Sequence, residues 1–76
     1  MKELLTYIVQ NLVSDPDSVA ITENAQGDEI VYELRVAPED MGRVIGRHGR
    51  IAKEIRTLMK ATGSRENKRV SVEILD

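Results

Sequence analysis

Residues 46 to 49 read Gly46-Arg47-His48-Gly49, two glycines that enclose two basic side chains. Glycine has no Cβ, so a turn of this kind lets a foreign backbone approach closely. The hydrophobic pattern that follows predicts a long helix from about residue 49, whose unpaired N–H groups and positive dipole end face the turn. Phosphate binds well at such a helix start. The spacing therefore predicts a site for the phosphate backbone of a nucleic acid, and we call these four residues the glycine turn.

The distribution of charge along the chain is compatible with such a partner. The 76 residues carry a net charge of −2. Residues 1–41 hold two basic and nine acidic residues, a net charge of −7, whereas residues 42–69 hold nine basic and two acidic residues, a net charge of +7. Phosphate responds to the local charge rather than to the total. The glycine turn lies in the basic half, so the overall acidity does not exclude nucleic acid.

The residue types needed for catalysis or metal binding are scarce. There is no cysteine, which excludes disulfides and thiolate chemistry. His48 is the only histidine, and its neighbours are Arg and Gly rather than a nucleophile, an orienting acid or further ligands. Helix-end and turn roles account for Asp15, Asp17, Glu39 and Asp40. We therefore expect no enzyme activity, no catalytic residue, no metal and no cofactor.

The sequence also shows no basic and apolar leader and no apolar run long enough for a membrane span. We therefore expect a cytoplasmic protein without a membrane partner. Its length suits a single small domain, residues 1–76, in which only a limited number of residues can be buried in the core.

Hydrophobic periodicity predicts the order α-β-β-α-α-β. The short connection at 24–28 makes the first two strands an antiparallel hairpin, and the two-helix crossover favours a parallel pairing of the last two strands. This places the second strand in the middle of a three-stranded mixed sheet covered on one face by the helices. Gly63 is expected to end the long helix. The expected elements are helix 2–13, strand 18–24, strand 29–37, helix 39–45, a helix of about 13 residues from Gly49, and strand 69–75.

Tyr7 and Tyr32 are the only aromatic residues. Tyr32 alternates with Ile30 and Leu34 on one face of its strand, so we expect it to pack in the core. Modules that bind RNA mainly by base stacking display several aromatic side chains. The sequence therefore argues against stacking as the main source of affinity.

The order of elements around the glycine turn resembles a known family. A strand, a short helix, Ile45-Gly46-Arg47-His48-Gly49, a long helix and a strand, within residues 29–75, are similar to the core of the KH domain, a module for single-stranded RNA or DNA. The helix and hairpin before that core resemble the bacterial type II arrangement, an α+β fold. The runs 32–40, 42–46 and 49–53 resemble the small bacterial KhpA-type RNA-binding proteins.

This resemblance implies how RNA would be held. In KH domains the glycine turn fixes the sugar-phosphate backbone, and about four nucleotides lie across a narrow groove. By that resemblance Arg47 and His48 neutralise phosphates. Val44, Ile45 and Ile51 contribute to the groove wall or to the core beneath it. The helical spacing places Lys53, Arg56 and Lys60 on the outer face of the long helix, where an ordinary solvated face explains them as well as RNA contact does, so we treat them as electrostatic background. The residues expected to bind RNA are Arg43, Val44, Ile45, Gly46, Arg47, His48, Gly49, Arg50 and Lys53.

The resemblance implies a single-stranded RNA-binding protein, such as a bacterial RNA chaperone or post-transcriptional regulator. The preference for RNA over DNA rests on the resemblance, since no residue in the sequence is an evident contact for a 2′-hydroxyl. One small groove makes few contacts, so we expect a homodimer or a heterodimer with another KH-containing RNA-binding protein. The alternative is a protein-interaction or ribosome-assembly module in which RNA contact is secondary.

Overall fold

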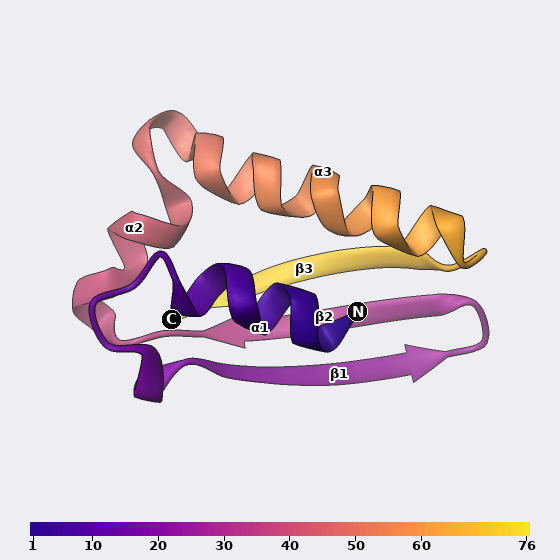
Figure 1. Cartoon of the computed structure of the whole chain (residues 1–76), viewed down its shortest axis with the longest axis horizontal. Helices are drawn as coiled ribbons and strands as arrows, with labels where there is room; N and C mark the ends of the chain where they lie inside the picture. Colours follow the sequence, from indigo (N-terminus) through magenta and orange to yellow (C-terminus); the bar gives the residue numbers. More distant parts are fainter.

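The computed structural model describes all 76 residues and has the expected α-β-β-α-α-β order (Figure 1). Three single-turn 3-10 helices connect or extend the main elements, at Pro16–Ser18, Pro38–Asp40 and Arg47–Gly49. The last of these is the glycine turn, which stands at one corner of the molecule on the far side from β1. The main elements are α1 (Lys2–Gln10), β1 (Ala20–Gln26), β2 (Glu29–Arg35), α2 (Met41–Ile45), α3 (Arg50–Arg65) and β3 (Arg69–Leu75).

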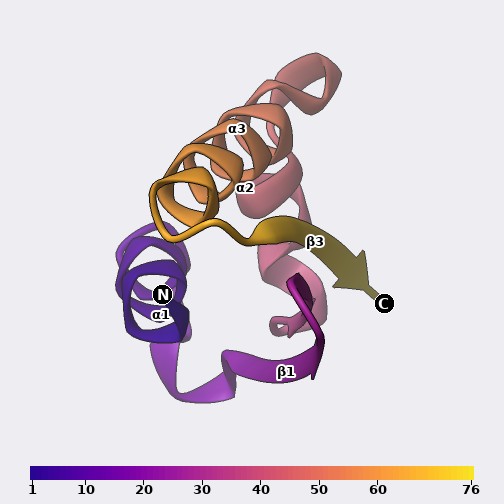
Figure 2. The ribbon, with the colours of Figure 1, turned by 90° about the vertical axis from the view of Figure 1, so that its right-hand side faces the viewer.

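The three strands form one mixed sheet with β2 in the middle, as predicted. β1 pairs with β2 antiparallel, which sets Ile21 opposite Leu34. β3 pairs with β2 in parallel, which sets Ile74 opposite the same Leu34. Figure 2 shows α1 and α3 on the same side of the sheet. The other face of the sheet is uncovered, so residues such as Arg35 remain exposed there.

The core lies between this sheet and the helices. Tyr32 is 1% exposed and packs within it, so the expected core role of this tyrosine is confirmed. Burial, aided by a hydrogen bond to Glu23, raises the pKa of Tyr32 to about 12. The core cluster combines the inward faces of β2 and β3 with one stripe of each long helix: Leu5, Val9, Ile30, Tyr32, Leu34, Val44, Ile55, Met59, Val70 and Val72.

Several element boundaries differ from those expected. α1 ends at Gln10 rather than at residue 13. The backbone amide and the side-chain amide of Asn11 both donate to the Tyr7 carbonyl, at 3.2 Å and 2.7 Å, and the Leu12 amide then donates to Val9 in a tighter turn. The Pro16–Ser18 turn delays the start of β1 to Ala20. The hairpin loop is then only two residues long, Gly27-Asp28.

Gly63 does not end α3, contrary to the prediction. The helix continues to Arg65, and Gly63 is buried inside it. A Cβ on Gly63 would collide with the side chain of Val70 and lie 3.0 Å from the carbonyl oxygen of Lys68. This glycine is therefore required by the close approach of the chain that returns into β3. The positive φ after the helix falls instead on Asn67, at 59°.

None of the helices combines the length and the apolar composition needed to span a bilayer.

Candidate nucleic-acid interface

The glycine turn depends on left-handed backbone angles. Gly46 has a φ of 76° and Gly49 a φ of 73°, and both positions are strained for residues with a side chain. Two hydrogen bonds close the turn: the amide of Gly46 donates to Gly42 at 2.9 Å, and the amide of Gly49 donates to Gly46 at 3.1 Å. The local conformation therefore requires glycine at both ends.

The two glycines differ in what lies beside them. A Cβ on Gly46 would lie 2.9 Å from the backbone nitrogen of Ile51 and collide with the Ile51 side chain. A Cβ on Gly49 would meet nothing within 4 Å. The space left by Gly46 is thus occupied by the protein itself, whereas the space beside Gly49 is open to another molecule.

His48 also adopts a left-handed conformation, with φ 58° and ψ 24°. This region is uncommon for residues other than glycine, although histidine enters it more readily than most. Strained positions of this kind cluster at binding sites, where the surrounding structure holds them. Residue types and spacing did not predict this conformation. The only sequence signal for it is the position of His48 between a basic residue and a glycine in a tight turn.

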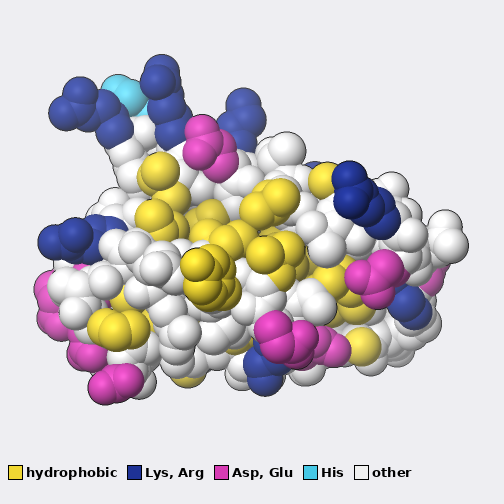
Figure 3. Space-filling view, viewed as in Figure 1, with side chains coloured by type: hydrophobic (Ala, Val, Ile, Leu, Met, Phe, Trp, Pro, Cys, Tyr) yellow, Lys and Arg dark blue, Asp and Glu magenta, His cyan; other side chains and the backbone are white.

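The basic side chains of the turn project from the body of the molecule. In Figure 3 the single histidine, in cyan, stands between dark-blue basic side chains on a protrusion. Arg47, His48, Arg50 and Lys53 are all exposed. None of them forms a hydrogen bond or ion pair within the protein. Their charges are therefore available to an external anion.

The start of α3 adds backbone donors at the same place. Gly49 is the N-cap residue, no side chain caps the helix there, and its first turn contains no acidic residue. The Arg50 amide donates to the carbonyl of Arg47, and no side chain caps the amides that follow it. The dipole of a 16-residue helix adds positive potential at the same place. An anion bound at the turn would contact these amides and lie in this positive potential.

The side chains beside the turn divide between core and surface. Val44 is fully buried, so it supports the turn from beneath, one of its two expected places. Ile45 is 38% exposed and offers an apolar surface next to the turn. Ile51 is half-buried against Gly46.

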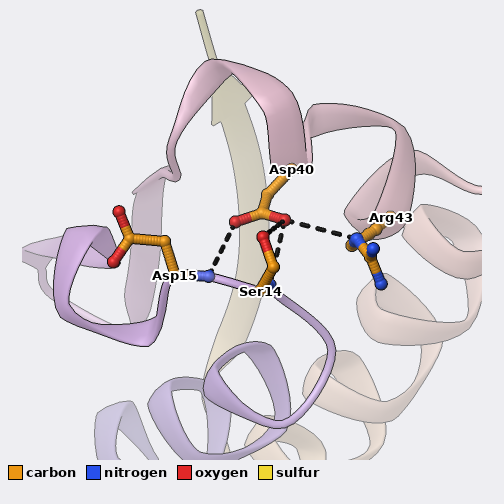
Figure 4. Close-up of polar contacts among 4 residues, drawn as sticks. All are labelled: Ser14, Asp15, Asp40 and Arg43. Carbon is orange, nitrogen blue, oxygen red and sulfur yellow. Dashed lines mark hydrogen bonds and ion pairs between the residues drawn. The ribbon is translucent and has the colours of Figure 1, made fainter.

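Asp40 is a fully buried carboxylate just before α2, and Figure 4 shows its partners. One oxygen accepts hydrogen bonds from the Ser14 amide at 2.9 Å and the Ser14 hydroxyl at 2.8 Å, and the other accepts from the Asp15 amide at 3.0 Å. The backbone hydrogen bond from Ser14 is the main cause that lowers the pKa of Asp40, and the charge of Arg43 contributes. Asp40 therefore joins the segment after α1 to the start of α2, a role beyond the helix-end position that the sequence predicts for it.

Arg43, an expected RNA contact, is engaged by this same carboxylate. Its Nε lies 3.3 Å from Asp40, while 61% of its side chain remains exposed. Part of its charge is thus neutralised within the protein. Among the expected site residues Arg43 is the only one with an ion pair.

Arg56 departs from the expected basic background. Its Nε donates a hydrogen bond to the carbonyl oxygen of Val72 in β3 at 3.1 Å. This contact crosses from α3 to an outer strand of the sheet. Lys53 and Lys60, which share the exposed side of α3 with Arg56, make no such contact.

A second surface feature lies between α1 and α3. A shallow pocket of about 220 Å³ is lined by Ile8, Leu12, Ile51, Glu54, Ile55 and Leu58. Leu58 is 44% exposed beside it. Figure 3 shows apolar side chains gathered across this face, below the basic protrusion. No group of His, Cys, Asp or Glu side chains is arranged to hold a metal ion.

Comparison with known proteins agrees with this architecture. The chain is 56% identical over 75 residues to the RNA-binding protein KhpA of Clostridium acetobutylicum, an alignment that covers 99% of this chain and 100% of that protein. It is 49% identical over 76 residues to the RNA-binding protein KhpA of Listeria monocytogenes, with both proteins covered completely.

The fold also recurs in a larger solved structure. The crystal structure of Era in complex with MgGDPNP and nucleotides 1506–1542 of 16S ribosomal RNA matches 95% of this chain with a TM-score of 0.60. The sequence identity is 23% and the match covers 28% of the Era chain, so this likeness concerns the fold. The model of the KhpA/KhpB KH domain matches residues 2–74. The chain belongs to the KhpA/KhpB KH-domain family.

Proposed function

We propose that this protein binds single-stranded RNA through the glycine turn and catalyses no reaction. The observation that carries the proposal is the exposed, unpaired basic turn with an open approach beside Gly49. The relatives that match over the full chain are named RNA-binding proteins. A role as an RNA chaperone or post-transcriptional regulator in the cytoplasm is consistent with that name.

The RNA backbone would be held in three ways. It would approach most closely beside Gly49, where no protein atom fills the space. Arg47 and His48 would supply positive charge, and the amides that follow Arg50 at the start of α3 would donate to a phosphate oxygen. Because the site is short, about four nucleotides would lie along α3 and β3 with their bases beside Ile45 and the helix.

Titration with short RNAs tests this proposal. Log affinity against log salt should fall with a shallow slope of about −2, since few phosphates are neutralised. A perfect duplex should compete poorly, because its bases are unavailable to the groove. A duplex preferred over an unstructured strand of equal length would overturn the groove model and favour a purely electrostatic contact.

The apolar surface of α1 and α3 supports a second part of the proposal, a homodimer. Ile8, Leu12, Ile51 and Leu58 form this surface on the α1 side of α3. Glu54 lies within the same pocket, and the exposed Arg50 and Lys53 line the neighbouring one. Acidic and basic side chains therefore border the apolar residues. Two copies related by a twofold axis would place these opposite charges against each other.

Such a pairing would leave both glycine turns exposed. Two turns held on one RNA raise the apparent affinity by about 10²–10⁴ when the geometry allows simultaneous binding. A heterodimer with another KH-containing RNA-binding protein would use the same surface. The protein-interaction alternative differs in that this surface would bind a partner while the basic turn contributed nothing to RNA affinity.

A further inference from the structure

The two flanks of α3 carry different chemistry. The flank toward α1 presents Ile51 and Leu58, with Glu54 as the only acidic residue of the helix. Arg56 and Lys60 are four residues apart and share the other flank, whereas Lys53, which lines a pocket with Glu54 and Leu58, lies between the two flanks. The hydrogen bond from Arg56 to Val72 shows that this basic flank faces β3. An RNA strand that leaves the glycine turn along α3 is therefore drawn to the β3 side.

Arg56 differs from the two lysines because its guanidinium is fixed. Its Nε donates to the Val72 carbonyl at 3.1 Å, which ties the planar group to the backbone of an outer strand. Lysine presents a flexible point charge, whereas arginine presents a rigid fork of donors. Restricting the fork in advance reduces the entropy lost when it binds a partner.

Most of the donors of Arg56 remain unused. An arginine side chain has five N–H donors, and Arg56 makes only the one hydrogen bond and no ion pair. Arg43 and Arg69, by contrast, face carboxylates: Arg43 pairs with Asp40, and Arg69 pairs with Asp28. The terminal amino groups of Arg56 are thus free in a part of the surface without a competing acid partner.

The position of Arg56 suits a base rather than the clamped phosphate. It follows Gly49 by seven residues on the same helix, about 10 Å along the helix axis. A strand of about four nucleotides that starts at the glycine turn reaches this distance. Because the RNA backbone would be held at the glycine turn, the edge of a base further along the strand would lie beside the Arg56 guanidinium.

We propose that Arg56 is a specificity-determining residue that reads one base with two adjacent hydrogen-bond acceptors. This inference rests on the proposed RNA-binding function. Guanine offers such a pair at O6 and N7, and cytosine offers one at O2 and N3, whereas adenine and uracil have no adjacent acceptor pair. A parallel pair of N–H donors from arginine matches this pattern, as it does in the reading of guanine in DNA.

The experiment measures binding of the full chain to four eight-nucleotide strands: oligouridylate, and the same strand with one central guanine, cytosine or adenine. The parent protein should bind the guanine or cytosine strand at least about fivefold more tightly than the other two, the lower end of what a bidentate pair supplies. The guanine and cytosine arms identify which base is read. Arg56→Lys should retain the charge and bind all four strands within about twofold of each other, because the fork is lost.

Lys60→Gln is the matched control on the same flank. It should weaken binding to all four strands by a similar factor and leave the preference intact, since Lys60 supplies charge without a fixed fork. A purely structural role of Arg56 would lower affinity for every strand equally in Arg56→Lys while preserving the preference. That result, or a parent protein without any preference, overturns the inference.

Nuclear magnetic resonance of the Arg56 side chain avoids reliance on a variant that folds poorly. In parent protein with ¹⁵N-labelled arginine, the Arg56 guanidinium signals should shift with the preferred strand and stay unchanged with oligouridylate. Unchanged signals with every strand that binds also overturn the inference. If none of the four strands binds at all, the proposed function itself fails, which is a distinguishable outcome.

Discussion

The space that a side chain on Gly46 would need is filled by Ile51. A Cβ on Gly46 would lie 2.9 Å from the Ile51 backbone nitrogen and within the Ile51 side chain, but a Cβ on Gly49 would meet nothing within 4 Å. Both glycines have positive φ. The pair that looks symmetric in sequence therefore divides into one glycine needed for packing and one that leaves room for a ligand.

This division predicts different effects of two alanine substitutions. Gly46→Ala should lower stability markedly, since steric collision adds to the strain of a residue at φ 76° and ψ 173°, a region essentially restricted to glycine. Gly49→Ala should cost only the strain, yet weaken RNA binding by about tenfold or more, equivalent to about 1.4 kcal/mol. Thermal denaturation and RNA titration of both variants measure the two effects.

Gly42→Ala is the matched control for these variants. Gly42 lies in α2 without a positive φ, and a Cβ there meets nothing within 4 Å. It should bind RNA as the parent does and be equally or more stable. A Gly49→Ala variant that folds and binds like the parent would show that the open space is not used.

The basic pair of the turn provides a second prediction. Replacing Arg47 and His48 together with Asp should abolish RNA binding, because two negative charges would face the phosphates. The thermal midpoint should change little, since both side chains are exposed and unpaired. Fluorescence titration and differential scanning calorimetry measure the two quantities.

The control for this double variant is Ser64→Asp with Arg65→Asp, which changes the charge by the same amount at the other end of α3. That end is about 24 Å from the turn at 1.5 Å per residue. At physiological salt this distance exceeds the screening length of about 8 Å, so binding should weaken far less. Equal loss in both double variants would mean that net charge, rather than the turn, decides binding.

The buried Asp40 makes stability depend on pH in a defined direction. Its folded pKa lies below its ordinary value because Ser14 and Asp15 donate hydrogen bonds to the carboxylate. The resulting stabilisation is present above the unfolded pKa of about 3.9 and is lost as the pH falls through the folded value. Asp40→Asn should therefore lower the thermal midpoint most at neutral pH, and the difference from the parent should shrink as the pH falls below about 4.

Ser14→Ala serves as the partial variant, since it removes only the hydroxyl donor and keeps both backbone donors. Its effect should be smaller than that of Asp40→Asn. A difference between parent and Asp40→Asn that stays constant from neutral to acidic pH would contradict the assigned cause of the low pKa.

The apolar surface of α1 and α3 supplies the fourth prediction. The parent protein should sediment as a dimer at micromolar concentration, and Leu58→Glu should sediment as a monomer. The fold should survive, because Leu58 is already 44% exposed. Thr22→Glu adds the same charge to an exposed position of β1 on the uncovered face of the sheet and should remain dimeric. A parent protein that sediments only as a monomer would rule out the homodimer.

Local sequence patterns were sufficient for much of this molecule. The alternation of Ile30, Tyr32 and Leu34 fixes which side chains of β2 face the core, because side chains along a strand point alternately to its two faces. The glycine turn was also located correctly between two helices, since glycine and helical periodicity are both short-range signals.

Element ends were less predictable because distant groups decide them. Gly63 has the residue type of a helix terminus, yet the helix continues because the chain returning to Val70 needs the space that a side chain would fill.

The sequence by itself therefore determined the order of the elements, the inward face of the strands and the position of the glycine turn, since each depends on residues a few positions apart. Only the tertiary structure decided that Asp40 holds Ser14, that Ile51 fills the space beside Gly46, and that Arg56 reaches Val72. Those pairs are joined by the packing of α2 and α3 against the rest of the chain. Charge and burial at such contacts depend on the distances that folding creates, which the spacing of residues along the chain does not record.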